Sequence, residues 1–373
     1  MKQYRFLISG GGTGGHIFPA LAIAQKLKQE FPDAEFLFIG ANGKMEMKRV
    51  PDAGFDIKGI DIYGISRDFS LKGITKNIKL PFILMSSMRK VKKIIKEFSP
   101  DIAIGVGGFA SGPALRAAAA LHIPTLIQEQ NSFPGVTNKL LADQVQTICV
   151  AYDGLEKYFK KEKIVLTGNP VREIILNIHN KEKNAYSLFE LNRKKKTLLV
   201  VGGSLGARSI NETIAQNIEV IESMGLQLIW QTGELFFKTI SPEILKKQNE
   251  QIKIMPFIKE MDKAYAIADF IISRAGAIAI SELTIVGKPV ILVPFPFAAE
   301  DHQTKNAKAL SDHQAALFVQ DKEVNEKLIP ELKRLTEEVG LAAQLSQNIK
   351  TFAQPQAIDK IVTEIKKLTM PNA

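Results

Sequence analysis

Short apolar runs alternate with longer amphipathic segments along almost the whole chain. The runs are rich in Val, Ile, Leu and Phe, and the segments between them carry apolar residues at helical spacing. This alternation is typical of parallel β-sheets covered by helices. The sequence therefore predicts an α/β protein with two doubly wound, Rossmann-like parallel sheets. The predicted strands lie at residues 5–9, 35–39, 102–106, 125–128, 147–151 and 164–167, and then at 197–201, 227–231, 253–255, 270–273, 290–293 and 316–319.

A turn near residue 168 separates the two series of strands. Gly168-Asn169-Pro170 follows the last strand of the first series, and a polar stretch at 180–196 precedes the second series. Gly, Asn and Pro together mark the end of regular structure. We therefore expect one domain over residues 1–165 and a second over 166–349, each long enough for its own core.

Glycine-rich turns follow the first predicted strand of each series. One runs from Gly10 to Gly15 and the other from Gly202 to Gly206, and each leads into a predicted helix. Such a turn points backbone N–H groups and the positive end of a helix dipole at one spot, which suits a phosphate. One turn alone could serve only a tight strand–helix connection. A third glycine cluster, at 105–112, also follows a strand, and three such turns favour ligand binding at the strand ends.

Gly10, Gly12 and Gly15 also satisfy the G-x-G-x-x-G pattern of dinucleotide-binding folds. That alternative requires an acidic residue at the end of the second strand to hold a ribose diol. Residues 38–42 contain no acid, and Asp33 and Glu35 lie at the beginning of that strand, which is the wrong end. The sequence therefore disfavours NAD or FAD.

An acidic residue in the second half is placed to orient a nucleoside. Glu282 lies about two turns into a helix that follows the strand at 270–273. A carboxylate there can accept hydrogen bonds from both ribose hydroxyls. The alternative is an ordinary solvated acid on a helix face. The polar loop at 294–303 follows the next strand, at the edge where open α/β sheets bind ligands.

Lysine and arginine outnumber acidic residues by 49 to 39, a formal net charge of +10, which favours anionic partners. Eight basic residues and no acidic ones lie at 72–96, where they surround the apolar run 80–85. This pattern suits an anionic membrane surface, at about 1 kcal/mol for each nearby basic residue. The alternative is a helix packed on the first sheet with a solvated lysine face.

Cysteine usage and hydropathy indicate a protein of the cytoplasm. The single cysteine, Cys149, excludes a disulfide framework and a thiolate metal cluster. The amino terminus has no signal-peptide pattern, and no apolar stretch approaches the roughly 20 residues that span a bilayer. No Asp-x-Asp pair occurs in the chain, so the usual carboxylate ligands of a metal-bound diphosphate are missing. We expect no metal and no other cofactor.

Seven segments match one known family in the expected order. They are GGTGGHIFPALA from Gly11, GVGGFASGP from Gly105, EQNSFPGVTNKLL from Glu129, GNPVR from Gly168, GGSLGARSIN from Gly202, SRAGAIAISEL from Ser273 and DHQTKNA from Asp301. Through them the chain resembles, over nearly its whole length, the MurG family of bacterial peptidoglycan enzymes in glycosyltransferase family 28. The resemblance implies the GT-B fold, in which two Rossmann-like domains face each other across a cleft that holds the active site. It also implies that a last helix within residues 350–373 packs back on the first domain.

The implied reaction builds peptidoglycan. N-acetylglucosamine (GlcNAc) moves from UDP-GlcNAc to the 4-hydroxyl of undecaprenyl-pyrophosphoryl-MurNAc-pentapeptide, converting lipid I to lipid II with inversion at the anomeric carbon. The first domain would bind the acceptor and face the membrane, and the second would bind the UDP-sugar. The resemblance places the enzyme on the cytoplasmic face of the cell membrane, with cell-wall synthesis and division proteins as partners and no nucleic acid.

The resemblance also assigns roles to individual residues. Inversion requires a base for the acceptor hydroxyl, and the catalytic candidates are His16 and Glu129. UDP-GlcNAc would be bound by Thr13, Gly14, Gly15, Asn131, Arg172, Ser204, Ile258, Ala277, Ser281, Glu282 and Gln303. The acceptor pyrophosphate would be bound by Gly12, Gly107, Gly108 and Phe109.

Within the donor set each implied contact is specific. Ser204 and Arg172 would hold the diphosphate, and Ile258 would meet uracil through its backbone. Glu282 would take the ribose, and Gln303 would read the sugar hydroxyls together with an asparagine of the first domain. Without metal ligands, helix amino termini and Arg172 would carry the charge of the departing diphosphate.

Other functions remain open at this stage. The nearest is another inverting GT-B glycolipid glycosyltransferase that uses a UDP-sugar, for instance on diacylglycerol. A UDP-sugar epimerase of the same fold would need neither an acceptor nor a membrane patch. A nucleic-acid binder would explain the charge, but no RNA-binding signature accompanies it.

Overall fold

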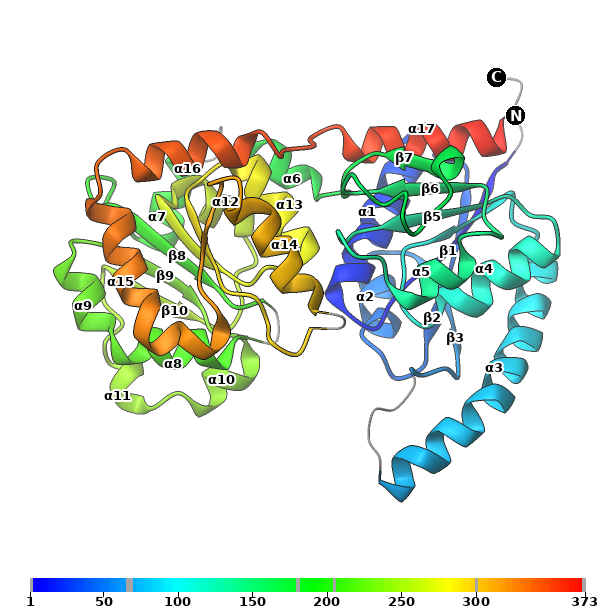
Figure 1. Ribbon diagram of the computed structural model, residues 1–373, viewed down its shortest axis with the longest axis horizontal. Coiled ribbons are helices and arrows are strands. Elements are labelled where there is room, and N and C mark those ends of the chain that lie inside the picture. Colours follow the sequence, from blue (N-terminus) through cyan, green and yellow to red (C-terminus); the bar gives the residue numbers. More distant parts are fainter. Residues whose placement is uncertain (1–2, 65–69, 179–181, 204–205, 299–300, 371–373) are drawn as a thin grey trace. The chain divides into compact units, whose positions relative to one another are not determined.

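The computed structural model (Figure 1) forms two compact units, each built on one parallel sheet. The first unit comprises Met1–Val171 with Gln356–Ala373, and the second comprises Arg172–Pro355. The predicted fold class, two parallel α/β sheets, is confirmed. The structure describes residues 3–64, 70–178, 182–203, 206–298 and 301–370.

The first unit contains a seven-stranded sheet in the order β3-β2-β1-β4-β5-β6-β7. The sequence analysis predicted six of these strands and missed β3, which lies at the sheet edge. Its sequence, DIKGI, alternates polar and apolar residues, and only Ile60 is fully buried. The strands are β1 (Arg5–Ser9), β2 (Glu35–Ala41), β3 (Asp56–Ile60), β4 (Ile102–Gly105), β5 (Thr125–Glu129), β6 (Thr147–Val150) and β7 (Ile164–Leu166).

Helices cover both faces of this sheet (Figure 1). Successive residues of β1 point to opposite faces, so Phe6 packs in one core cluster with α1 and α17, and Leu7 packs in another with α3 and α4. The last helix, α17, buries Ile361 and Ile365 in the cluster of the first unit. The helices are α1 (Gly14–Glu30), α2 (Glu46–Asp52), α3 (Leu71–Phe98), α4 (Ser111–Ala120), α5 (Val136–Leu141) and α17 (Ala357–Thr369), with a 3-10 turn at Lys161–Lys163.

Helix α3 is anchored to the sheet only by its carboxyl-terminal part. Val91, Ile94 and Ile95 are buried in the core, whereas the amino-terminal part extends away from the sheet (Figure 1). Along that part, Ile78 and Phe82 are 63% and 70% exposed. Among the described residues, no helix has both the length and the hydrophobicity needed to cross a bilayer.

The second unit contains a six-stranded sheet in the order β10-β9-β8-β11-β12-β13. Two core clusters, one on each face, pack helices against it. The strands are β8 (Thr197–Val201), β9 (Gln227–Gln231), β10 (Ile252–Met255), β11 (Phe270–Ser273), β12 (Val290–Leu292) and β13 (Leu317–Phe318). The helices are α6 (Glu173–Leu176), α7 (Glu182–Phe189), α8 (Arg208–Gln216), α9 (Ile218–Ser223), α10 (Glu234–Thr239), α11 (Pro242–Leu245), α12 (Met261–Ile267), α13 (Ala277–Val286), α14 (His302–Ser311), α15 (Val324–Glu337) and α16 (Leu341–Lys350), with a 3-10 turn at Asp321–Glu323.

Candidate active site

The first glycine turn connects β1 to α1 at the carboxyl edge of the first sheet. Gly12 has a φ of +89°, which a side chain would strain. Thr13 is extended, and its carbonyl accepts from the N–H groups of His16 and Ile17, which starts α1. The turn therefore presents Thr13, Gly14 and Gly15 at a helix amino terminus, and their contact with the donor sugar stays a prediction.

A buried carboxylate that the sequence analysis missed holds this turn in place. Glu46, the first residue of α2, is fully buried and accepts hydrogen bonds from Gly12 N at 2.9 Å and from Ala41 N at 3.0 Å. A Cβ atom on Gly11 would lie 2.2 Å from its carboxylate oxygen. The Gly12 N–H is thus donated to Glu46, and its predicted contact with the acceptor pyrophosphate stays a prediction.

The third glycine cluster lies directly against the first turn. Gly107 and Gly108 have φ values of +89° and +85°. A Cβ on Gly108 would lie 2.3 Å from the Gly11 carbonyl oxygen, and a Cβ on Gly107 would lie 3.0 Å from His16 Nε2. Only glycine fits this approach. The structure therefore brings together Gly107, Gly108 and His16, while Phe109 beside them is 47% exposed.

His16 has a defined hydrogen-bond environment at the start of α1. Its Nδ1 lies 3.1 Å from the Gly11 carbonyl oxygen and 3.4 Å from Thr13 Oγ1. A carbonyl oxygen can only accept, so this contact requires a proton on Nδ1. In the neutral ring Nε2 then carries the lone pair.

Glu129, the other catalytic candidate, is saturated with hydrogen bonds. It is 1% exposed and accepts from Asn131 N, Asn131 Nδ2, Gly135 N and Asn138 Nδ2 at 2.9, 3.2, 3.0 and 2.8 Å. These bonds fold the loop between β5 and α5 around the carboxylate. This geometry favours a positioning role for Glu129, and its catalytic role stays a prediction.

In the second unit, a neutral glutamine links two parts of the predicted donor site. Gln231 Oε1 accepts from Ile258 N at 2.9 Å, and its Nε2 donates to the Gly203 carbonyl at 3.2 Å. Gln231 is buried and ends β9. The Ile258 N–H is thus donated to Gln231, and the contact of the Ile258 backbone with uracil stays a prediction. Ser204 lies outside the described residues.

Arg172 and Glu282 form a bidentate ion pair. Arg172 Nε donates to Glu282 Oε1 at 2.8 Å, and a terminal nitrogen donates to Oε2 at 3.0 Å. The Glu282 side chain is 7% exposed and that of Arg172 is 38% exposed. Burial alone would lower the pKa of the Arg172 guanidinium, but the Glu282 carboxylate raises it above its ordinary value. Burial, together with Glu282, also raises the pKa of Tyr265.

An arginine with no predicted role ties the loops at the carboxyl edge of this sheet together. Arg274 donates to the carbonyls of Val293 and Pro294 at 3.2 and 3.1 Å and also pairs with Asp321 at 2.5 Å. The loop it supports leads to Gln303, whose Oε1 accepts from Phe295 N at 2.9 Å. On α13, Ser281 Oγ donates to the Ala277 carbonyl at 3.0 Å.

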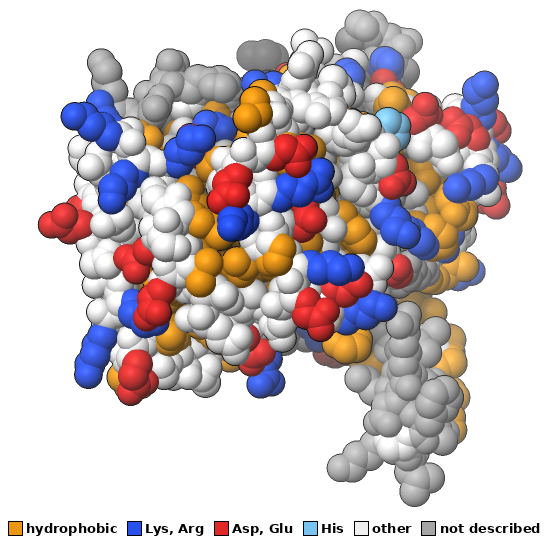
Figure 2. Space-filling model, turned by 60° about the vertical axis from the view of Figure 1, so that its left-hand side comes forward, with side chains coloured by type: hydrophobic (Ala, Val, Ile, Leu, Met, Phe, Trp, Pro, Cys, Tyr) orange, Lys and Arg blue, Asp and Glu red, His pale blue; other side chains and the backbone are white. Residues whose placement is uncertain are grey.

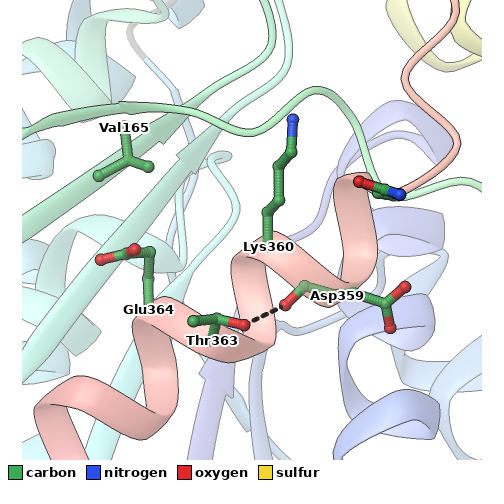
Figure 3. A pocket seen from close by; sticks show the side chains of 6 residues that line it. Val165, Asp359, Lys360, Thr363 and Glu364 are labelled. Atoms are coloured by element: carbon green, nitrogen blue, oxygen red, sulfur yellow. Dashed lines mark hydrogen bonds between the residues drawn. The ribbon is translucent and has the colours of Figure 1, made fainter.

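A solvent-open hollow of about 380 Å³ lies elsewhere on the first unit, between α17 and β7 (Figure 3). It is lined by Val165, Gln356, Asp359, Lys360, Thr363 and Glu364. The Thr363 hydroxyl donates a hydrogen bond to the Asp359 carbonyl at 2.8 Å. This hollow contains no predicted site residue, so we do not place the active site there. Within the described part of the chain, no three His, Cys, Asp or Glu residues are grouped to hold a metal ion.

The comparisons with known proteins define the class. Residues 6–150 match the glycosyltransferase family 28 N-terminal domain, and residues 197–361 match the glycosyltransferase family 28 C-terminal domain. The first match includes six of the seven strands of the first sheet, and the second includes all six strands of the second sheet; each includes the glycine turn of its unit. The protein is therefore a two-domain glycosyltransferase of the GT-B fold.

Three similar proteins identify the family. The UDP-N-acetylglucosamine–N-acetylmuramyl-(pentapeptide) pyrophosphoryl-undecaprenol N-acetylglucosamine transferase of Cytophaga hutchinsonii is 52% identical, covering 98% of this chain and 96% of the relative. The enzyme of the same name from Flavobacterium psychrophilum is 49% identical, covering 99% and 98%. The crystal structure of Acinetobacter baumannii MurG is similar with a TM-score of 0.76 at 30% identity, covering 98% and 100%. The chain belongs to the MurG family of glycosyltransferase family 28, as its motifs predicted.

Proposed function

We propose that the protein transfers GlcNAc from UDP-GlcNAc to the 4-hydroxyl of undecaprenyl-pyrophosphoryl-MurNAc-pentapeptide, converting lipid I to lipid II in peptidoglycan biosynthesis. The observation that carries this proposal is the identity of about half to relatives with that printed name, over nearly the full length of both chains. The epimerase and nucleic-acid alternatives have no comparable support.

The first unit supplies the acceptor side and the base. His16 Nε2, with its lone pair fixed by the Nδ1 contact to Gly11, accepts the proton of the acceptor hydroxyl as that oxygen attacks the anomeric carbon. Direct attack inverts the configuration and expels UDP. Glu129 keeps the 129–138 loop folded, so that Asn131 can contact the sugar.

The second unit supplies the donor side. The turn at 202–206 and the amino terminus of α8 hold the diphosphate, and Arg172 adds charge. Glu282 orients the ribose, Ile258 reads uracil, and Ala277, Ser281 and Gln303 complete the pocket. We propose that these groups stabilise the departing diphosphate without a metal ion.

We further propose that α3 docks the enzyme on the cytoplasmic face of the membrane. Ile78, Phe82 and Met85 are exposed and follow one another at helical spacing with Arg89, Lys92 and Lys96. The basic residues line a hollow of about 450 Å³ together with Lys93 and Glu97. Hydrophobic side chains line an edge of the projecting α3, whereas the face of the second unit mixes acidic and basic side chains (Figure 2). Apolar and basic residues arranged in this way along α3 would bind an anionic membrane surface, which is where a lipid-linked acceptor is found.

The test is transfer of labelled GlcNAc from UDP to the lipid-linked MurNAc-pentapeptide, in the presence of EDTA, with diacylglycerol as the control acceptor. A β-linked muramyl product supports the enzyme class, the acceptor and the independence from metal together. Product only after Mg²⁺ or Mn²⁺ is restored would overturn metal independence. Product on diacylglycerol alone would replace our acceptor, and failure to bind UDP-GlcNAc would overturn the function.

A further inference from the structure

The ion pair of Arg172 and Glu282 occupies the atoms that the proposed donor would use. Both carboxylate oxygens of Glu282 accept from the guanidinium, at 2.8 and 3.0 Å. Burial, together with Glu282, raises the pKa of the Tyr265 hydroxyl. Tyr265 is 3% exposed and the Glu282 side chain 7%, so the carboxylate that the guanidinium holds is largely buried.

A ribose diol and this guanidinium therefore compete for Glu282. A planar guanidinium binds a carboxylate through two parallel N–H bonds, and a ribose diol that bound this carboxylate in the same bidentate way would have to take the place of the guanidinium. If a nucleoside displaced Arg172, the partly exposed guanidinium would lose its partner, which costs less than for a fully buried charge but still opposes binding. A diphosphate offers that guanidinium a second anionic acceptor with the same bidentate geometry.

We propose that this ion pair makes the donor site selective for nucleoside diphosphates over nucleosides. The diphosphate withdraws Arg172 from Glu282, and the carboxylate then accepts the ribose hydroxyls. A ligand with a ribose but no diphosphate breaks the ion pair and offers the guanidinium no new anionic partner, so it binds more weakly. This inference rests on the proposed function, because that function assigns the ribose to Glu282 and the diphosphate to Arg172.

Removing the arginine separates this role from simple phosphate binding. In Arg172→Met, we expect UDP to bind at least about tenfold more weakly, because a bidentate charged contact is lost. We expect uridine to bind about three- to tenfold more tightly, because Glu282 is released for the ribose; the upper limit is modest because the Arg172 side chain is 38% exposed. The measurement is calorimetric titration of the full chain with UDP and with uridine.

The direction in which Arg172→Met changes the affinity for uridine decides the inference. An arginine that only binds phosphate would leave uridine binding unchanged, and one that only supports the fold would weaken both ligands. Either result overturns the selectivity role. Arg172→Lys keeps the charge but loses the bidentate guanidinium. It should change the affinities for UDP and uridine in the same directions by smaller factors, and it replaces the methionine variant if that variant does not fold. Arg334→Met removes another arginine that pairs with a glutamate in the same unit, on α15, and should change neither affinity.

The two proposals fail in different ways. If the unaltered protein binds neither UDP-GlcNAc nor UDP, the proposed function is overturned. If it binds both and Arg172→Met still shows no gain for uridine, only the selectivity role is overturned.

Discussion

Replacing Glu129 with glutamine separates two roles of this buried carboxylate. A general base needs the charge of the carboxylate, whereas a loop anchor needs its two oxygens. The structure shows four N–H donors on these oxygens, two of them from Asn131 and one each from Gly135 and Asn138. Glutamine fits the space but replaces one oxygen by an NH₂ group, which can only donate.

The expected loss of stability follows from these bonds. Each oxygen of Glu129 receives two of the donors, so two donors lose their acceptor in either amide orientation. The bond from Asn138 is buried, and the other three are part-buried. A buried donor without an acceptor costs about 1–3 kcal/mol, and a part-buried donor costs less because water can replace its acceptor. We therefore expect Glu129→Gln to lower the free energy of unfolding of the first unit by roughly 1–3 kcal/mol.

The single tryptophan allows the two units to be followed separately. Trp230 is the only one in the chain and lies in β9 of the second unit, so its fluorescence reports the second unit and circular dichroism reports both. In urea, Glu129→Gln should move the first-unit transition in circular dichroism and leave the fluorescence transition in place. A variant as stable as the unaltered protein, with a loss of kcat of about a thousandfold or more, would refute this reasoning and favour a general base.

Three further predictions concern other parts of the first unit. Gly108→Ala should destabilise the first unit by about 3 kcal/mol or more in a urea titration, because a φ of +85° is combined with a Cβ only 2.3 Å from a backbone oxygen. The control is Gly154→Ala, where φ is also positive but no atom lies near the added Cβ, and it should cost only about 1 kcal/mol. Phe82→Asp should weaken binding to anionic vesicles in a sedimentation assay, whereas Leu235→Asp, at a residue 68% exposed on α10, should not. Burial raises the pKa of the Cys149 thiol, so alkylation should require unfolding. The unfolded thiol ionises first, so the thiol's contribution to stability should be constant at neutral pH and fall as the pH rises above about 9.

The fold was predictable where the sequence pattern is local. Parallel strands buried on both faces are continuous apolar runs, so a run such as residues 197–201 in β8 can be recognised as a strand from the sequence alone. The edge strand β3 has only one neighbour, β2, and four of its five residues are exposed or partly exposed. Its apolar residues are therefore separated by Lys58 and Gly59. Nothing local in such a segment distinguishes it from a loop.

The candidate site was predictable only at its glycines and its family motifs. Glu46, Gln231 and Arg274 act through partners far along the chain, such as Gly12 for Glu46 and Ile258 for Gln231. Their residue types are ordinary, so only the fold reveals their role. One signal was available: Glu46 follows the second strand by five residues, just beyond the strand end at which the dinucleotide pattern requires an acid. The structure brings that glutamate back to the first glycine turn, with both oxygens on backbone N–H groups.

The two glycine turns that look equivalent in the sequence differ in charge. The first turn donates Gly12 N–H to the fully buried Glu46 carboxylate, so a phosphate placed there would meet a negative charge that already uses one of its donors. The second turn is contacted by the neutral amide of Gln231 and belongs to the same unit as Arg172. Since the interaction of two like charges in a poorly solvated site is large, we infer that the donor diphosphate is directed to the second turn. The first turn is then suited to uncharged sugar hydroxyls, beside the imidazole of His16, the proposed base.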